Sequence, residues 1–199
     1  MAGSLNLVDE RDRVGRETFR ILLNDAVPAT VERIATRTCF GEDAVREGLS
    51  QLDAIGRLQF DAQGRVVAIF GLSLLSTKHR MSLRGRDFHT WCAYDSVGIP
   101  AALGESAHVS NSCELCHQVI EFDIVEGRVP EMPIVVSWLV QPCASIREEF
   151  CPTVNFFCDE AHFVAWAPEG YPRSAFLTLE QAAIEGQKNW GWAATPEQP

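Results

Sequence analysis

Two thiols and one carboxylate are the residues of this chain whose types and spacing suggest chemistry. Cys92 and Asp95 lie three residues apart, so they share one face of any helix formed there. A second thiol, Cys151, lies far downstream. A structural zinc site usually closes with four ligands, whereas two thiols beside a proton donor suit one soft, thiophilic ion. The pattern therefore predicts chemistry on a soft metal.

Each of these residues also has an ordinary interpretation. At the start of a helix, Cys92 would feel the positive end of the helix dipole, which favours the thiolate, but free cysteine is often simply buried. If Asp95 is buried beside Trp91, it can carry a proton at neutral pH; otherwise it is a solvated helix carboxylate. Cys151 either fills the core or binds the ion, with Cys158 as a spare or competing thiol seven residues on.

The segment Cys113–His117 has the pattern Cys-x-x-Cys-His, which is also the attachment signature of c-type haem. Haem is disfavoured because that attachment takes place outside the cytoplasm and the sequence shows no export signal. The Cys-x-x-Cys pair also resembles half of a zinc site, but no second pair follows at a suitable spacing. His117 or His108 is then the candidate to complete an adventitious site. The alternative is a turn whose thiols only pack or scavenge metal.

Composition and net charge indicate the class of protein and the kinds of partner that it can bind. The 199 residues are 46% hydrophobic and 22% charged, which is typical of a soluble globular protein. The formal net charge of −10 disfavours nucleic acid, because affinity for phosphates comes largely from Lys and Arg. The sequence shows no signal peptide and no apolar run long enough to span a membrane, so we expect a cytoplasmic location with the seven cysteines reduced.

The first part of the chain resembles a winged-helix module. Two short helices around Gly41 resemble a helix-turn-helix, but the second carries mostly acidic residues, which have the wrong sign for a groove lined by phosphates. We therefore expect a structural or dimerising winged-helix-like module over residues 1–72. Its expected elements are helices at 12–25, 30–35 and 42–52 and a hairpin of strands at 58–60 and 66–70.

Beyond residue 72 short strand patterns alternate with short helices. This predicts an α+β domain over residues 73–199 with a mixed or antiparallel sheet. The helix that contains Cys92 should end near Pro100, because proline lacks a backbone donor and disfavours a helical residue before it. The expected strands are 81–83, 107–110, 119–124, 134–140 and 154–157, and the expected helices are 88–97, 144–150 and 179–186.

Taken together, the motifs resemble the bacterial organomercurial lyases, also called alkylmercury lyases. They occur in the family's order and spacing and span most of the chain. The segments that carry the resemblance are Trp91-Cys92-Ala93-Tyr94-Asp95, Pro100-Ala101, Val109-Ser110-Asn111-Ser112-Cys113 and Phe150-Cys151-Pro152-Thr153-Val154-Asn155-Phe156-Phe157.

The resemblance implies a mercury-resistance enzyme that cleaves the carbon–mercury bond of R-Hg⁺ by protonolysis to give R-H and Hg²⁺. It places the catalytic cysteines at Cys92 and Cys151, the catalytic aspartate at Asp95 and a structural cysteine at Cys113. The product Hg²⁺ would stay on both catalytic sulfurs with Asp95 nearby. No organic cofactor is implied; cellular thiols would remove Hg²⁺, with mercuric reductase as the recipient.

Two other functions fit the cysteines. A soft-metal-sensing winged-helix regulator would bind DNA, which the net charge disfavours, and would not need Asp95 beside Cys92. A non-catalytic mercury- or copper-binding protein would retain the metal and leave methylmercury intact.

Overall fold

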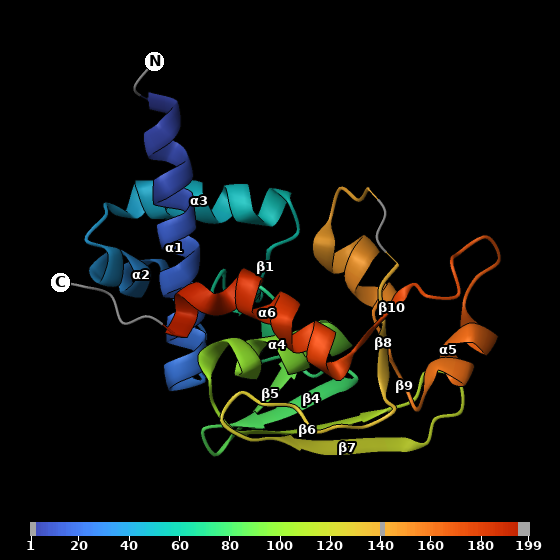
Figure 1. The fold of residues 1–199 in the computed structure, drawn as a ribbon. Helices are drawn as coiled ribbons and strands as arrows, with labels where there is room; N and C mark the ends of the chain where they lie inside the picture. Colours follow the sequence, from blue (N-terminus) through green and yellow to red (C-terminus); the bar gives the residue numbers. More distant parts are fainter. Residues whose placement is uncertain (1–2, 140–141, 195–199) are drawn as a thin grey trace. The chain divides into compact units, whose positions relative to one another are not determined.

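The computed structural model describes residues 3–139 and 142–194, with side chains from residue 10 onward. The chain divides into two compact units: one contains the residues up to 76 together with 143–149, and the other contains 77–142 and the chain from 150 onward. Helices and antiparallel strands occur together, so the predicted α+β class is confirmed (Figure 1). Within the described part of the chain, every helix is too short or too polar to cross a membrane.

The first unit begins with three helices, α1 (Gly3–Asp25), α2 (Val31–Thr38) and α3 (Glu42–Ala54). The side chain of Thr30 caps α2 by accepting a hydrogen bond from the Arg33 amide. The three predicted helices are therefore present, and α1 begins earlier than expected. Their apolar faces pack together, with α1 against both α2 and α3 (Figure 1).

Three short antiparallel strands complete this unit: β1 (Leu58–Phe60), β2 (Val66–Ile69) and β3 (Leu72–Ser73). The carboxylate of Asp61 closes the turn between β1 and β2 by accepting hydrogen bonds from two backbone amides of the loop. The predicted hairpin is confirmed. The winged-helix assignment and the boundary at residue 72 stay predictions.

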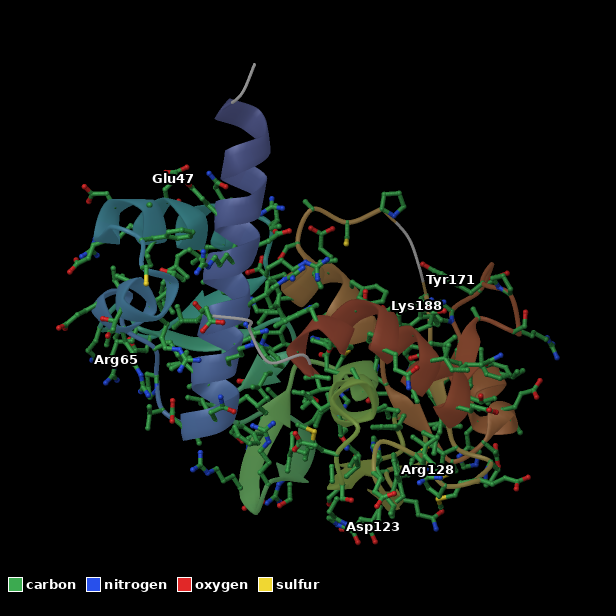
Figure 2. All side chains as sticks on the ribbon, turned by 60° about the vertical axis from the view of Figure 1, so that its left-hand side comes forward. Glu47, Arg65, Asp123, Arg128, Tyr171 and Lys188 are labelled. Atoms are coloured by element: carbon green, nitrogen blue, oxygen red, sulfur yellow. The ribbon has the colours of Figure 1, made fainter. Side chains whose placement is uncertain are left out.

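The second unit contains four antiparallel strands in the order β5-β4-β6-β7. They are β4 (His79–Leu83), β5 (Arg86–Thr90), β6 (Ala107–Ser112) and β7 (Val119–Ile124). Every second side chain of β7 is buried, and those between face solvent, including Asp123 (Figure 2). One face of the sheet therefore packs on the core.

Three further strands form a smaller antiparallel sheet in the order β10-β8-β9. They are β8 (Val135–Ser137), β9 (Phe156–Phe157) and β10 (Phe176–Thr178). Both β8 and β9 are shorter than the predicted strands 134–140 and 154–157, and Val140 lies outside the described residues.

Two short helical turns lie between β8 and β9, the π-helical η1 (Ile146–Phe150) and the 3-10 turn η2 (Cys151–Thr153). They replace the predicted helix 144–150. The short α5 (Glu160–Trp166) follows β9, and the last helix is α6 (Leu179–Ala194), which extends the predicted helix 179–186.

Two predictions about the helix near Cys92 are wrong. Residues expected to start that helix form β5 instead, and α4 covers Ala93–Leu103. Pro100 lies inside α4, which ends at Gly104 in the left-handed conformation. Proline removes one hydrogen bond there, but α4 is buried almost along its whole length, so packing outweighs the local preference.

A glycine pair lets α4 and α6 approach closely within the second unit (Figure 1). A Cβ atom built on Gly186 would lie 2.3 Å from the Gly98 Cα atom and 2.7 Å from its carbonyl oxygen. Any side chain at Gly186 would therefore separate the helices. The N-terminus of α4 carries the candidate site, so this contact helps to position it.

Candidate active site

Cys92 is the N-cap residue of α4, and Asp95 is the third residue of that helix. The Cys92 amide donates a hydrogen bond of 2.9 Å to Oδ2 of Asp95, and the Asp95 amide donates to the Cys92 sulfur. This is a capping box in which a thiol takes the place of the usual serine or threonine. The helix start therefore fixes the thiol and the carboxylate relative to each other.

Cys151 begins the turn η2, which is held by two buried polar residues. Ser137 Oγ donates a hydrogen bond of 2.7 Å to the Thr153 carbonyl and accepts one of 2.8 Å from the Asn155 amide. The Asn155 side chain donates to the Pro152 carbonyl at 3.1 Å. These bonds attach the turn to β8 and fix the backbone that carries the Cys151 thiol.

The structure brings the three predicted residues together in the second unit. Each residue offers one ligand atom, and the three atoms, from Cys92, Asp95 and Cys151, all lie within 4.8 Å of one another. The Ala93 amide donates to the Val154 carbonyl at 3.1 Å, which joins the start of α4 to the end of η2. The three residues are 1%, 5% and 3% exposed, so a metal bound between them would be shielded from water.

Burial is the largest influence on the pKa of the Cys92 thiol. It raises the pKa of the thiol well above its ordinary value, and the contact with Cys151 and the charge of Asp95 act in the same direction. The amide of Asp95 lowers the pKa, but by less. Burial therefore outweighs the preference for the thiolate at the start of a helix, and the metal-free Cys92 thiol keeps its proton.

Aromatic side chains surround the segments that carry the site. The ring of Tyr94 contacts those of Trp138 and Trp190, with centroids 4.9 and 5.2 Å apart, and Trp138 stacks edge-on against Phe150 at 5.3 Å. The Tyr94 hydroxyl accepts a hydrogen bond of 2.6 Å from Asn189 on α6. The residues that flank Cys92 and Cys151 are therefore packed against aromatic rings.

A second group of sulfur atoms lies elsewhere in the same unit. Cys158 is not a spare thiol for the catalytic group: its sulfur lies 3.7 Å from that of Cys116. Neither imidazole predicted beside the Cys-x-x-Cys pair joins these sulfurs. His108 instead contacts Asp123 at 2.8 Å, and the imidazole in the cluster is that of His162.

Sequence reasoning missed residues that act beside the cysteines. Ser137 lies outside the motifs and gave no signal, because a buried polar side chain that binds backbone cannot be told from a surface one by pattern. Asn155 lies inside the Phe150–Phe157 motif, but the motif assigned it no role. His162 had a signal in its spacing of four residues from Cys158, which is also common in zinc sites.

A buried pair of thiols with a carboxyl group, built on an α+β unit with antiparallel sheets, defines a protein that handles a soft metal ion or its organic compounds. Comparison with known proteins gives the family. Residues 72–190 match the family model described as MerB, alkylmercury lyase.

Curated relatives agree with that match. The chain is 31% identical to an alkylmercury lyase of Staphylococcus epidermidis over 87% of this chain and 82% of the relative. It is 33% identical to one from Streptomyces lividans, over 81% of this chain and 74% of the relative. The fold matches the crystal structure of the mercury-bound form of MerB2 with a TM-score of 0.78 at 17% identity, over 95% of this chain and 98% of that one. The chain therefore belongs to the alkylmercury lyase family, and the predicted family and enzyme class are confirmed.

Proposed function

We propose that this chain is an organomercurial lyase that cleaves the carbon–mercury bond of R-Hg⁺ by protonolysis. The observation that carries the proposal is the buried convergence of Cys92, Asp95 and Cys151 within 4.8 Å. Two thiols suit a soft ion, and a carboxyl group beside them can move a proton. The family assignment supports the same reaction.

The first step is loading of mercury onto sulfur. Each thiol that binds R-Hg⁺ loses its proton, because a coordinating thiol is deprotonated by the metal. Asp95 accepts one of these protons, and the other leaves to solvent. The high pKa of free Cys92 fits this order, since the thiol then ionises only when mercury arrives.

The second step is transfer of the proton to carbon. Two thiolates on mercury raise the electron density on the bound carbon, which makes that carbon easier to protonate. Asp95 delivers its proton to carbon as the carbon–mercury bond breaks, and the bond's electron pair forms the new C–H bond. R-Hg⁺ and two thiols thus give R-H, mercury held by two sulfurs, and one released proton. The step needs no organic cofactor and no oxidant.

Release of Hg²⁺ requires competing ligands, because two buried thiolates hold the ion tightly. Cellular thiols such as small cysteine-containing molecules are the exchange partners, and mercuric reductase is the recipient that the family suggests. Residues 1–72 serve as a winged-helix-like structural or dimerising module. The first turn of α3 carries Glu42 and Asp43, whose charge disfavours a role in binding phosphates.

The test is hydrocarbon release from methylmercury or phenylmercury under excess thiol. Cys92→Ser and Cys151→Ser should abolish release, whereas the matched control Cys39→Ser, an exposed thiol of the first unit, should keep it. Asp95→Asn keeps an oxygen to accept the amide of Cys92 but cannot deliver the proton, so release should fall about 10²–10⁴-fold.

Three results would contradict the proposal. Intact protein that binds mercury without releasing hydrocarbon would indicate a mercury- or copper-binding protein. Salt-sensitive binding of duplex DNA without hydrocarbon release would indicate a regulator. Full activity of the two cysteine variants would remove the assigned site.

A further inference from the structure

Three thiols and one imidazole converge in the second unit, apart from the catalytic residues. Cys113 and Cys116 come from the turn after β6, Cys158 follows β9, and His162 lies on α5. One ligand atom from each lies within 4.8 Å of all the others. We propose that these four residues form a closed, tetrahedral Zn²⁺ site that ties the three segments together.

The spacing of the donor atoms fits tetrahedral zinc. The sulfurs of Cys116 and Cys158 are 3.7 Å apart, and the Cys113 sulfur lies 3.4 Å from Nδ1 of His162. With zinc–sulfur bonds of about 2.3 Å and zinc–nitrogen bonds of about 2.0–2.1 Å, tetrahedral geometry places two sulfurs about 3.8 Å apart and a sulfur and a nitrogen about 3.6 Å apart. These two separations lie within about 0.2 Å of the tetrahedral values, and the other donor pairs, all within 4.8 Å, need to close by at most about 1 Å to coordinate the ion.

The backbone around the cysteine pair is already arranged for a metal-bound thiolate. The backbone amides of Leu115, Cys116 and Cys158 donate to the sulfur of Cys113. The turn itself closes through the His117 amide, which donates to the Cys113 carbonyl at 2.9 Å, and His117 adopts the left-handed conformation that ends it. Amides aimed at a sulfur stabilise its negative charge, which zinc ligation requires.

The other two ligands are fixed by elements that are themselves anchored. The Glu114 amide donates to the Phe156 carbonyl at 2.9 Å, which holds the cysteine turn beside β9 and hence near Cys158. The carboxylate of Asp159 caps α5 by accepting from the His162 amide at 2.9 Å. The four donors are therefore set by hydrogen bonds of the surrounding backbone.

The donor set identifies the class of ion. Three sulfurs and one nitrogen select zinc over calcium or magnesium, which prefer oxygen ligands. Four protein ligands leave no open position for a substrate, whereas the catalytic group offers only two thiols and a carboxyl group. Cys116 is exposed, so an ion can enter from solvent. The site is thus structural and distinct from the catalytic one.

The experiment measures metal bound to the intact protein, purified under reducing conditions from medium supplied with zinc. We expect one zinc ion per chain by elemental analysis, and the intense visible bands of tetrahedral thiolate-bound Co²⁺ after cobalt substitution. Cys116→Ser and Cys158→Ser should each lose both signals. The control His117→Asn alters the neighbouring imidazole outside the cluster, and the double variant Cys92→Ser/Cys151→Ser removes the catalytic thiols; both should keep them.

Several results would overturn the zinc site. One is protein that binds neither zinc nor Co²⁺ in a stoichiometric amount. Another is zinc that survives Cys116→Ser and Cys158→Ser but is lost with the catalytic thiols. A third is a cluster that takes up added Hg²⁺ yet never holds zinc, which would make it a mercury-binding group. The readout does not depend on hydrocarbon release, so failure of the lyase proposal leaves this test valid.

Discussion

The contact between α4 and α6 gives a prediction whose magnitude follows from the structure. Gly186→Ala places a methyl group 2.3 Å from the Gly98 Cα atom and 2.7 Å from its carbonyl oxygen, whereas ordinary contacts begin at 3.4 Å. Both of these neighbours are backbone atoms, so no side-chain rotation relieves the overlap. The helices must separate by roughly 1 Å, a form of overpacking that costs about 1–3 kcal/mol.

A matched control lies on the same helix. Gly191→Ala meets no atom within 4 Å, so it should only gain helix propensity, which is worth up to about 1 kcal/mol. The same gain partly offsets the overlap at Gly186, and because that overlap is with backbone we expect a net loss of about 2 kcal/mol there. The two variants should therefore differ by about 3 kcal/mol in free energy of unfolding.

Equilibrium urea unfolding measures this difference, and hydrocarbon release reports its effect on the site. Separation of the helices shifts α4, whose N-terminus carries Cys92 and Asp95, so Gly186→Ala should also release hydrocarbon more slowly. Equal stability of the two variants, or a Gly186→Ala protein as stable as the original, would refute the reasoning.

Two further predictions concern buried polar groups. Burial lowers the pKa of His79 to about 4 from 6.5, so the unfolded chain takes up this proton first and stability should fall by about 3 kcal/mol as the pH drops from 6.5 to 4. Urea midpoints at several pH values check this; His79→Gln should flatten the dependence, and an unchanged slope in that variant would contradict it. Ser137→Ala removes the two side-chain bonds that Ser137 makes beside Cys151 and leaves the bond from Asn155 to Pro152 in place. It should destabilise the protein by about 1–3 kcal/mol and slow hydrocarbon release, and an unaltered rate would mean that Ser137 does not position the thiol.

The sequence predicted the elements whose signals are local. The periodic apolar pattern of the first three helices and the alternation in Val119–Ile124 each reappear in the structure. The predictions failed where tertiary packing, rather than local preference, determines the secondary structure. Residues 88–90 read as the start of a helix but pair with β4, and Pro100 stays helical because nearly all of α4 is buried.

The two sulfur clusters also differ in how far the sequence could predict them. The family motifs indicated Cys92, Asp95 and Cys151, and the structure places them together. Local spacing alone could not join the Cys-x-x-Cys turn to Cys158 and His162, because that contact depends on how β6, β9 and α5 pack. A spacing rule that searches only for a second cysteine pair misses such a split set of ligands.

The most direct test of the central claim is a single turnover with protein in excess over phenylmercury, in D₂O and without added thiol. The account predicts one equivalent of benzene carrying a single deuterium, with the mercury left on the protein as Hg²⁺ bound by Cys92 and Cys151. Phenylmercury recovered intact from the protein, or benzene without deuterium, would contradict protonolysis at this site.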